Sequence, residues 1–113
     1  MPEVSPNDAK QLIHDGAQLV DVRTDDEFDA GHVPGAVHVR LEQLEVNSGL
    51  DRSKPVVLYC RTGERSGMAA DAFAASGWDA HSIAGGLIAW TEQGFALEPA
   101  DGEVAERSGL PPR

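Results

Sequence analysis

The chain contains a single cysteine, Cys60, and the residues around it are the ones best suited to chemistry. An apolar, β-branched stretch (55–59) leads into Cys60, and a short loop with two arginines and a glycine follows before a helical pattern begins. A loop between a strand and a helix directs backbone N–H groups and the positive end of the helix dipole at whatever it encloses. Such surroundings favour a thiolate over a thiol. Cys60 is therefore a candidate nucleophile inside an anion-binding loop.

Two alternatives stand beside this interpretation. A lone cysteine at the end of a buried strand can be a small apolar core residue, and the arginines can be a solvated pair on an ordinary loop. Arg61, Gly63 and Arg65 favour the nucleophile, because an inert core position needs neither flanking cations nor a glycine. Each arginine can bind an oxyanion through two hydrogen bonds, and Gly63 permits a tight turn, including a left-handed one.

Length and composition limit the class of protein. The 113 residues fit one domain with a single core. One cysteine excludes an internal disulfide and a two-cysteine redox cycle within the chain. No segment resembles a signal peptide or a membrane span, so we expect a cytoplasmic protein without a membrane partner. The formal charge of −10 also argues against nucleic acid as a partner.

Helical and strand patterns alternate along the chain. Ser5 and Pro6 are a typical helix start, and Thr24 and Glu27 have the spacing of a capping box. We expect helices at 5–14, 24–30, 65–76 and 87–93, one helical turn at 41–44, and strands at 18–22, 36–39, 55–59 and 80–84. This alternation predicts a small α/β domain with a largely parallel sheet. Such sheets gather their sites at the carboxyl ends of the strands, where Cys60 lies. Residues 1–97 are expected to form the domain, and 98–113 a polar, loosely held C-terminal extension.

Four motifs, in order, resemble those of the rhodanese family of sulfurtransferases. They are Leu19-Val20-Asp21-Val22-Arg23 with Glu27-Phe28, Gly31-His32-Val33-Pro34-Gly35-Ala36, the loop from Cys60 to Arg65, and Gly85-Gly86-Leu87 with Trp90. The resemblance covers roughly residues 5–95. It implies a rhodanese-like α/β domain with a central, mostly parallel five-stranded sheet and helices on both faces.

The resemblance also implies an activity, that of the thiosulfate:cyanide sulfurtransferase class. Cys60 would accept a sulfane sulfur from thiosulfate or a related donor as a persulfide and pass it to a thiophilic acceptor. Cys60 is then the catalytic residue. The substrate-binding residues are those that follow it: Arg61, Thr62, Gly63, Glu64, Arg65 and Ser66. Their N–H groups and the Arg65 guanidinium would offset repulsion between the thiolate and an anionic donor, and would stabilise the leaving sulfite.

Other charged residues are expected to support the loop. Asp21 and Arg23 lie near the site in the family fold, and Arg23 paired with Asp21 or Glu27 would be scaffolding. Glu64 adds negative charge, and we expect its side chain to point to solvent and pair with Arg61 or Arg65. The four histidines lack paired ligand spacing, so neither a metal nor a cofactor is expected.

The expected partners are a small anionic sulfur donor and a thiol or cyanide-like acceptor. The alternatives are a sulfur relay loaded by a sulfur-donating protein, and a phosphatase or arsenate reductase on the same fold. Dual-specificity phosphatases of the cell-cycle type have five residues between cysteine and arginine, whereas four separate Cys60 from Arg65. The shorter ring of N–H groups suits one sulfur atom better than phosphate. Arsenate reduction would need a second cysteine to resolve its intermediate, and the chain has only one.

Overall fold

Five short strands form the centre of the molecule, which we describe from a computed structural model over residues 3–44 and 49–105. The strands are β1 (Glu3–Val4), β2 (Gln18–Asp21), β3 (Val37–His38), β4 (Val56–Tyr59) and β5 (Ala80–Ile83). Their order in the sheet is β1-β5-β4-β2-β3, and every neighbouring pair is parallel. The predicted α/β class is confirmed. Because β4 is the central strand, Cys60 lies in the middle of the carboxyl edge.

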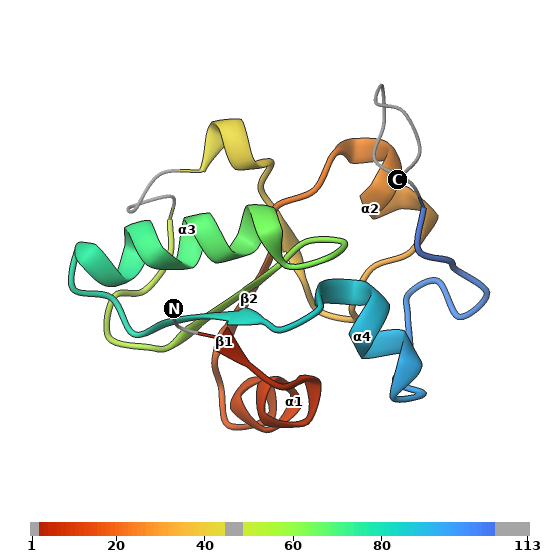
Figure 1. Cartoon of the computed structure of the whole chain (residues 1–113), viewed down its shortest axis with the longest axis horizontal. Coiled ribbons are helices and arrows are strands. Elements are labelled where there is room, and N and C mark those ends of the chain that lie inside the picture. The colour runs from red at the N-terminus through yellow and green to blue at the C-terminus, as the bar shows by residue number, and fades with distance from the viewer. Residues whose placement is uncertain (1–2, 45–48, 106–113) are drawn as a thin grey trace.

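Helices cover both faces of this sheet, as predicted (Figure 1). They are α1 (Pro6–His14), α2 (Asp25–Ala30), α3 (Glu64–Ala75) and α4 (Gly86–Glu92), with a 3-10 turn, η1 (Leu41–Gln43). α3 and η1 lie on one face, and α1 and α4 pack together on the other. At the start of α1 the Ser5 hydroxyl accepts a hydrogen bond from the Asp8 N–H at 3.1 Å, as its predicted N-cap role requires.

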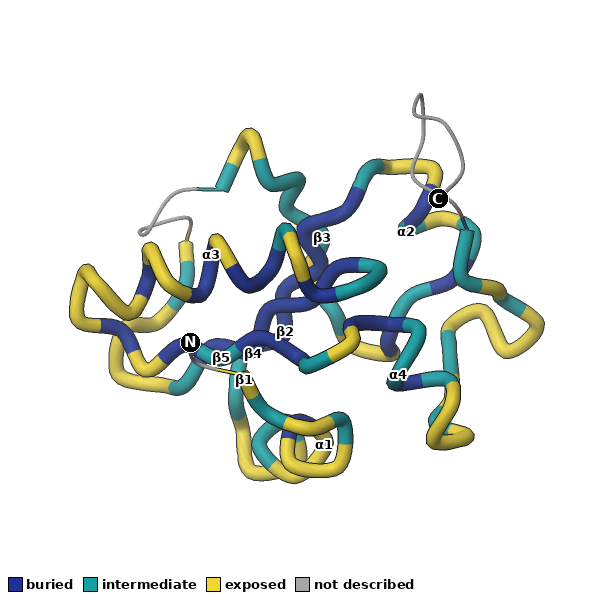
Figure 2. Tube along the Cα trace, viewed as in Figure 1, coloured by how far each residue is buried: buried dark blue, intermediate teal, exposed yellow. Residues whose placement is uncertain are grey.

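The side chains of the strands form two hydrophobic cores, one on each face of the sheet. Successive side chains of a strand point to opposite faces, so Leu58 and Cys60 pack toward α3, whereas Val57 and Tyr59 pack toward α1 and α4. All four side chains are inaccessible to solvent, and the strands form the dark centre of Figure 2. The loop that follows Cys60 is thus anchored by a strand that is buried on both sides.

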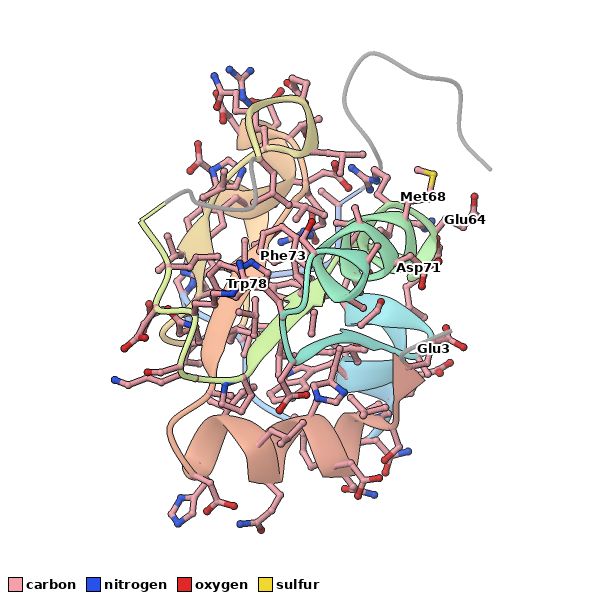
Figure 3. The ribbon with its side chains drawn as sticks, turned by 90° about the vertical axis from the view of Figure 1, so that its left-hand side faces the viewer. Glu3, Glu64, Met68, Asp71, Phe73 and Trp78 are labelled. Carbon is pink, nitrogen blue, oxygen red and sulfur yellow. The ribbon has the colours of Figure 1, made fainter. Side chains whose placement is uncertain are left out.

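The first core fixes α3 against the sheet. Phe73 and Trp78 contribute the aromatic part of this core, with ring centroids 5.2 Å apart. Figure 3 shows both rings on the inner side of α3 and Glu64, Met68 and Asp71 on its outer side. Packing along its length therefore holds α3 with its first turn beside Cys60.

The structure contains one strand that the residue pattern did not predict, β1. Its two residues pair with β5, Glu3 opposite Ser82 and Val4 opposite Ile83. Two residues are too few to show an alternating pattern, so the fifth strand came only from the family resemblance. Every other element was predicted, and the predicted and observed ends agree to within one residue.

The first part of the C-terminal extension contacts the rest of the domain. His32 and Glu98 form an antiparallel bridge with N–H···O distances of 3.1 and 2.8 Å, and the Glu103 N–H donates to the Ala30 carbonyl at 2.9 Å. Residues 98–105 thus run along the end of α2. The sequence predicts that this segment is loosely held. Residues 106–113 lie outside the described residues, and the domain limit at 97 stays a prediction. No helix in the described part of the chain is long and apolar enough to span a bilayer.

Candidate functional site

The sulfur of Cys60 receives hydrogen bonds from the loop that follows it. The Gly63 N–H donates to Sγ at 3.0 Å, and the Ser66 hydroxyl donates to it at 3.6 Å. Cys60, Gly63 and Ser66 are all buried. Donors directed at a sulfur stabilise its anionic form more than its neutral form. The loop therefore directs two hydrogen-bond donors at the sulfur.

The position of Gly63 depends on a backbone conformation that favours glycine. Its φ of 101° lies in the left-handed region, and it is the N-cap of α3. This turn directs both its own N–H and the first turn of α3 at the sulfur. The helix dipole places partial positive charge at the same point. The sequence-based role of Gly63, to permit a tight turn, agrees with this geometry.

The other side of the loop is held by the N-terminus of α4. The Leu87 N–H donates to the Cys60 carbonyl at 2.9 Å, and the Ile88 N–H donates to the Arg61 carbonyl at 3.2 Å. Gly86 makes this approach feasible, because a Cβ at that position would lie 2.6 Å from both carbonyl oxygens. Its φ of 61° is also left-handed. The motif at 85–87 therefore fixes the direction of two loop carbonyls, toward α4.

Arg65 is bound to a buried carboxylate. Its two terminal nitrogens donate to the two Glu27 oxygens at 2.9 and 3.0 Å, and Glu27 has no accessible surface. The Thr24 N–H and hydroxyl donate to the same carboxylate at 3.1 and 3.0 Å. Burial alone would raise the pKa of Glu27, but the hydrogen bonds from Arg65 and Thr24 outweigh it and lower that pKa. Burial likewise lowers the pKa of Arg65, but the hydrogen bonds and charge of Glu27, together with Cys60 and Asp21, outweigh burial and raise that pKa.

This ion pair adds a structural contact to the role that the sequence predicts for Arg65. Contact of its guanidinium with an anionic donor stays a prediction, and in the structure the guanidinium makes a two-pronged contact with Glu27 of α2. Both partners come from segments flanking the site, so the pair ties the start of α2 to the first turn of α3. Arg65 is thus placed to hold the loop, with its charge balanced by Glu27.

Asp21 and Arg23 form a second buried pair under the site. The Arg23 guanidinium donates to the Asp21 carboxylate at 2.7 to 3.1 Å, and both side chains have no accessible surface. Arg23 also donates to the Gly31 carbonyl at 2.8 Å. Burial lowers the pKa of Arg23, but the hydrogen bonds and charge of Asp21, together with the nearby Tyr59 and Glu27, outweigh burial and raise that pKa. The sequence predicts either Asp21 or Glu27 as the partner of Arg23, and in the structure the partner is Asp21.

The remaining loop residues differ in exposure. Arg61 and Thr62 are half-buried, and Glu64 is exposed and faces outward from α3. The Nε atom of Arg61 is buried and has no hydrogen-bond partner within residues 3–44 and 49–105. A buried donor without a partner is costly. Arg61 therefore has unused capacity to donate to an anion.

Sequence reasoning missed two residues of this site. Glu27 was recognised only through its capping-box spacing and as an alternative partner for Arg23, because its contact with Arg65 joins residues 38 positions apart. Ser82 was not singled out, yet its hydroxyl lies 2.7 Å from that of Ser66. The available signal for Ser82 was a polar residue inside an apolar strand.

Comparison with known proteins agrees with this geometry. The family model described as a rhodanese-like domain matches residues 5–93. A thiosulfate sulfurtransferase, GlpE, from Pseudomonas aeruginosa strain LESB58 is 32% identical over 105 residues, which are 91% of this chain and 92% of that protein. An uncharacterized protein, YqhL, from Bacillus subtilis strain 168 is 41% identical over 76 residues, 66% of this chain but only 60% of that protein.

A solved structure shares the fold. The rhodanese-like domain of the Alr3790 protein from Anabaena superposes with a TM-score of 0.76 at 24% identity. The superposition covers 100% of this chain and 88% of that domain.

Proposed function

The chain belongs to the rhodanese-like domain family, and from that premise we propose that it is a sulfurtransferase in which Cys60 carries the transferred sulfur. The thiosulfate sulfurtransferase name of a relative that matches over nearly its whole length supports this class of reaction. The observation that carries the assignment to Cys60 is its sulfur, which accepts hydrogen bonds from Gly63 and Ser66 at the first turn of α3.

The proposed reaction has two displacement steps. The Cys60 thiolate attacks the outer sulfur of thiosulfate and forms a new S–S bond, while the bond to the sulfonate sulfur breaks and sulfite leaves with its electron pair. An acceptor such as cyanide then attacks the outer sulfur of the Cys60 persulfide. A C–S bond forms, the S–S bond breaks, and thiocyanate leaves as the Cys60 thiolate is regenerated. No oxidant or reductant is needed in either step.

The loop suits both anionic states of the sulfur. Donors that are already in place stabilise charge without reorganising, which is how enzymes lower the barrier of a step that moves charge. Arg61 is the proposed side-chain contact for the oxygen atoms of the donor, because its buried Nε is unpartnered among the described residues. The proposed acceptors are thiols and cyanide-like thiophiles.

The test is transfer of sulfur to cyanide from thiosulfate and from glutathione persulfide, measured side by side on native protein and Cys60→Ser. We expect the native protein to form thiocyanate and Cys60→Ser to form none while it keeps its circular dichroism spectrum. Mass spectrometry after exposure to thiosulfate should show one added sulfur on the native chain alone. Substantial activity in Cys60→Ser would exclude the proposal. Comparing the two donors identifies the one that the site prefers.

A further inference from the structure

Two buried serine hydroxyls lie behind the sulfur of Cys60. Ser66, in the first turn of α3, has its Oγ 3.6 Å from Sγ and 2.7 Å from the Oγ of Ser82. Ser82 comes from β5, where it lies in register with Leu58 of β4. Neither serine has any accessible surface. The two hydroxyls therefore connect β5 with the sulfur of Cys60, which follows the neighbouring strand β4.

The hydrogen atoms of this pair can be assigned from the available acceptors. Within the described part of the chain, Ser66 is the one hydrogen-bond partner of the Ser82 side chain. Ser66 can donate either to Sγ or to the Gly63 carbonyl, which lies 3.4 Å away. If Ser66 donated to Ser82, the hydrogen of Ser82 would be buried without an acceptor, at an energetic cost. Ser82 is therefore the donor, and the hydrogen of Ser66 is left for one of two acceptors, the Cys60 sulfur or the Gly63 carbonyl.

We propose that Ser82 is a positioning residue for the nucleophile: its hydroxyl donates to Ser66 and thereby directs the Ser66 hydroxyl at the anionic sulfur of Cys60. The proposal rests on Cys60 being the reactive group, as proposed above. A hydroxyl that accepts a hydrogen bond is itself a stronger donor, because the bonds in a chain polarise one another. An anionic sulfur is also a better acceptor than the neutral Gly63 carbonyl. The chain Ser82, Ser66, Cys60 thus gains most when the sulfur is charged.

The test follows the ionisation of the thiol, which a purely structural role of Ser82 would not move. The rate of alkylation by iodoacetamide is measured against pH for native protein, Ser82→Ala, Ser66→Ala and the double variant. Ser82→Ala should shift the profile to higher pH and reduce the thiolate fraction below the midpoint about threefold, within the range of one lost hydrogen bond. In the Ser66→Ala background, Ser82→Ala should cause no further shift, because its route to the sulfur is already lost.

Matched variants separate this effect from loss of packing. Ile83→Val removes a methyl group from the neighbouring buried position of β5 and should leave the alkylation profile unchanged. If Ser82→Ala does not fold, Ser82→Thr and Ser82→Val provide a nearly isosteric pair. The hydroxyl of Thr should keep the native profile, and Val should shift it.

An unchanged profile in Ser82→Ala, equal profiles for Thr and Val, or a shift by Ser82→Ala that persists without Ser66 would each overturn the inference. The titration needs no sulfur donor. A native protein that transfers no sulfur would therefore refute the proposed function and leave the result for Ser82 readable.

Discussion

The three arginines near Cys60 have different surroundings, and this decides which of them can bind an anion. Arg23 and Arg65 each face a fully buried carboxylate, at 2.7 and 2.9 Å. Such a pair contributes little net charge to the loop. Arg61 and Arg23 each have one buried nitrogen, Nε and Nη1, without a hydrogen-bond partner among the described residues. Arg23 has no accessible surface, whereas Arg61 is half-buried. We therefore expect the side-chain part of anion binding to depend on Arg61.

Arg61→Ala should weaken the binding of thiosulfate while leaving the nucleophile in place. Loss of one charge-assisted hydrogen bond at a half-buried site corresponds to an increase of about tenfold in KM. The value of kcat should change less, because Gly63 and Ser66 still contact the sulfur. Steady-state kinetics with thiosulfate and cyanide provide the measurement. Arg61→Lys is the control, since it keeps the charge without the fork and should recover part of the loss. A native KM in Arg61→Ala would show that backbone groups bind the donor alone.

At the scale of elements, the sequence predicted the features of the fold that depend on a local residue pattern. The buried strand before Cys60, the helix after it and the glycines at the turns follow from alternation and from backbone conformation. Contacts between distant segments were not predictable in this way. The choice of Glu27 as the partner of Arg65, and the meeting of Ser82 with Ser66, depend on how α2, α3 and β5 pack in space. β1 was missed because two residues carry no periodicity.

The contact between α4 and the loop can be tested at Gly86. In Gly86→Ala the new methyl group would lie 2.6 Å from the carbonyl oxygens of Cys60 and Arg61, so α4 or the loop must shift. A left-handed φ adds about 1 kcal/mol of strain for a residue with a Cβ. We expect sulfur transfer to fall at least tenfold, since small displacements of reacting groups are costly. Kinetics and thermal unfolding are measured together.

Gly94→Ala is the matched control for this variant. Gly94 has a φ of 80°, so alanine there carries similar strain, yet its Cβ would meet no atom within 4 Å. This control should lose about 1 kcal/mol of unfolding free energy and keep native transfer kinetics. If both variants were less stable but kept native rates of sulfur transfer, the position of α4 would not matter to the chemistry.

The link between α2 and α3 predicts a dependence of stability on pH. The pKa of Glu27 is lower in the folded protein than its ordinary value of 4.5. Its contribution to the free energy of unfolding is therefore complete above pH 4.5 and is lost as the pH falls through the lowered value. Glu27→Gln should be about 3 kcal/mol less stable at neutral pH, because it breaks a buried pair. This difference should shrink in acid, as measured by urea unfolding.

The double variant Glu27→Gln with Arg65→Met is the control for this prediction. Removing both charges avoids an unpaired guanidinium, so the double variant should be more stable at neutral pH than Glu27→Gln alone. A difference between native protein and Glu27→Gln that stayed constant from neutral pH into acid would show that the carboxylate charge of Glu27 does not stabilise the fold.

At the scale of the whole molecule, the protein is acidic although the proposed donor is an anion. The net charge of −10 is distributed over a fold measuring 34 × 28 × 23 Å. The Debye length is about 30 Å at 0.01 M salt and about 8 Å at 0.15 M. At low salt an approaching anion is therefore repelled by the whole molecule. At physiological salt it responds mainly to the nearby Arg61 and the first turn of α3.

Added salt should consequently speed the reaction of Cys60 with anions. Iodoacetate and iodoacetamide are similar in size, but only the first is charged, so the ratio of their alkylation rates isolates the electrostatic effect from any change in the thiol. Between 0.01 and 0.15 M salt we expect this ratio to rise about threefold to tenfold, because screening removes distant repulsion and leaves local attraction. Arg61→Ala should lower the ratio at the higher salt concentration and leave its rise with salt in place. A ratio that fell as salt was added would mean that the local cationic groups dominate the field even at long range, and the acidic surface would then not oppose donor binding.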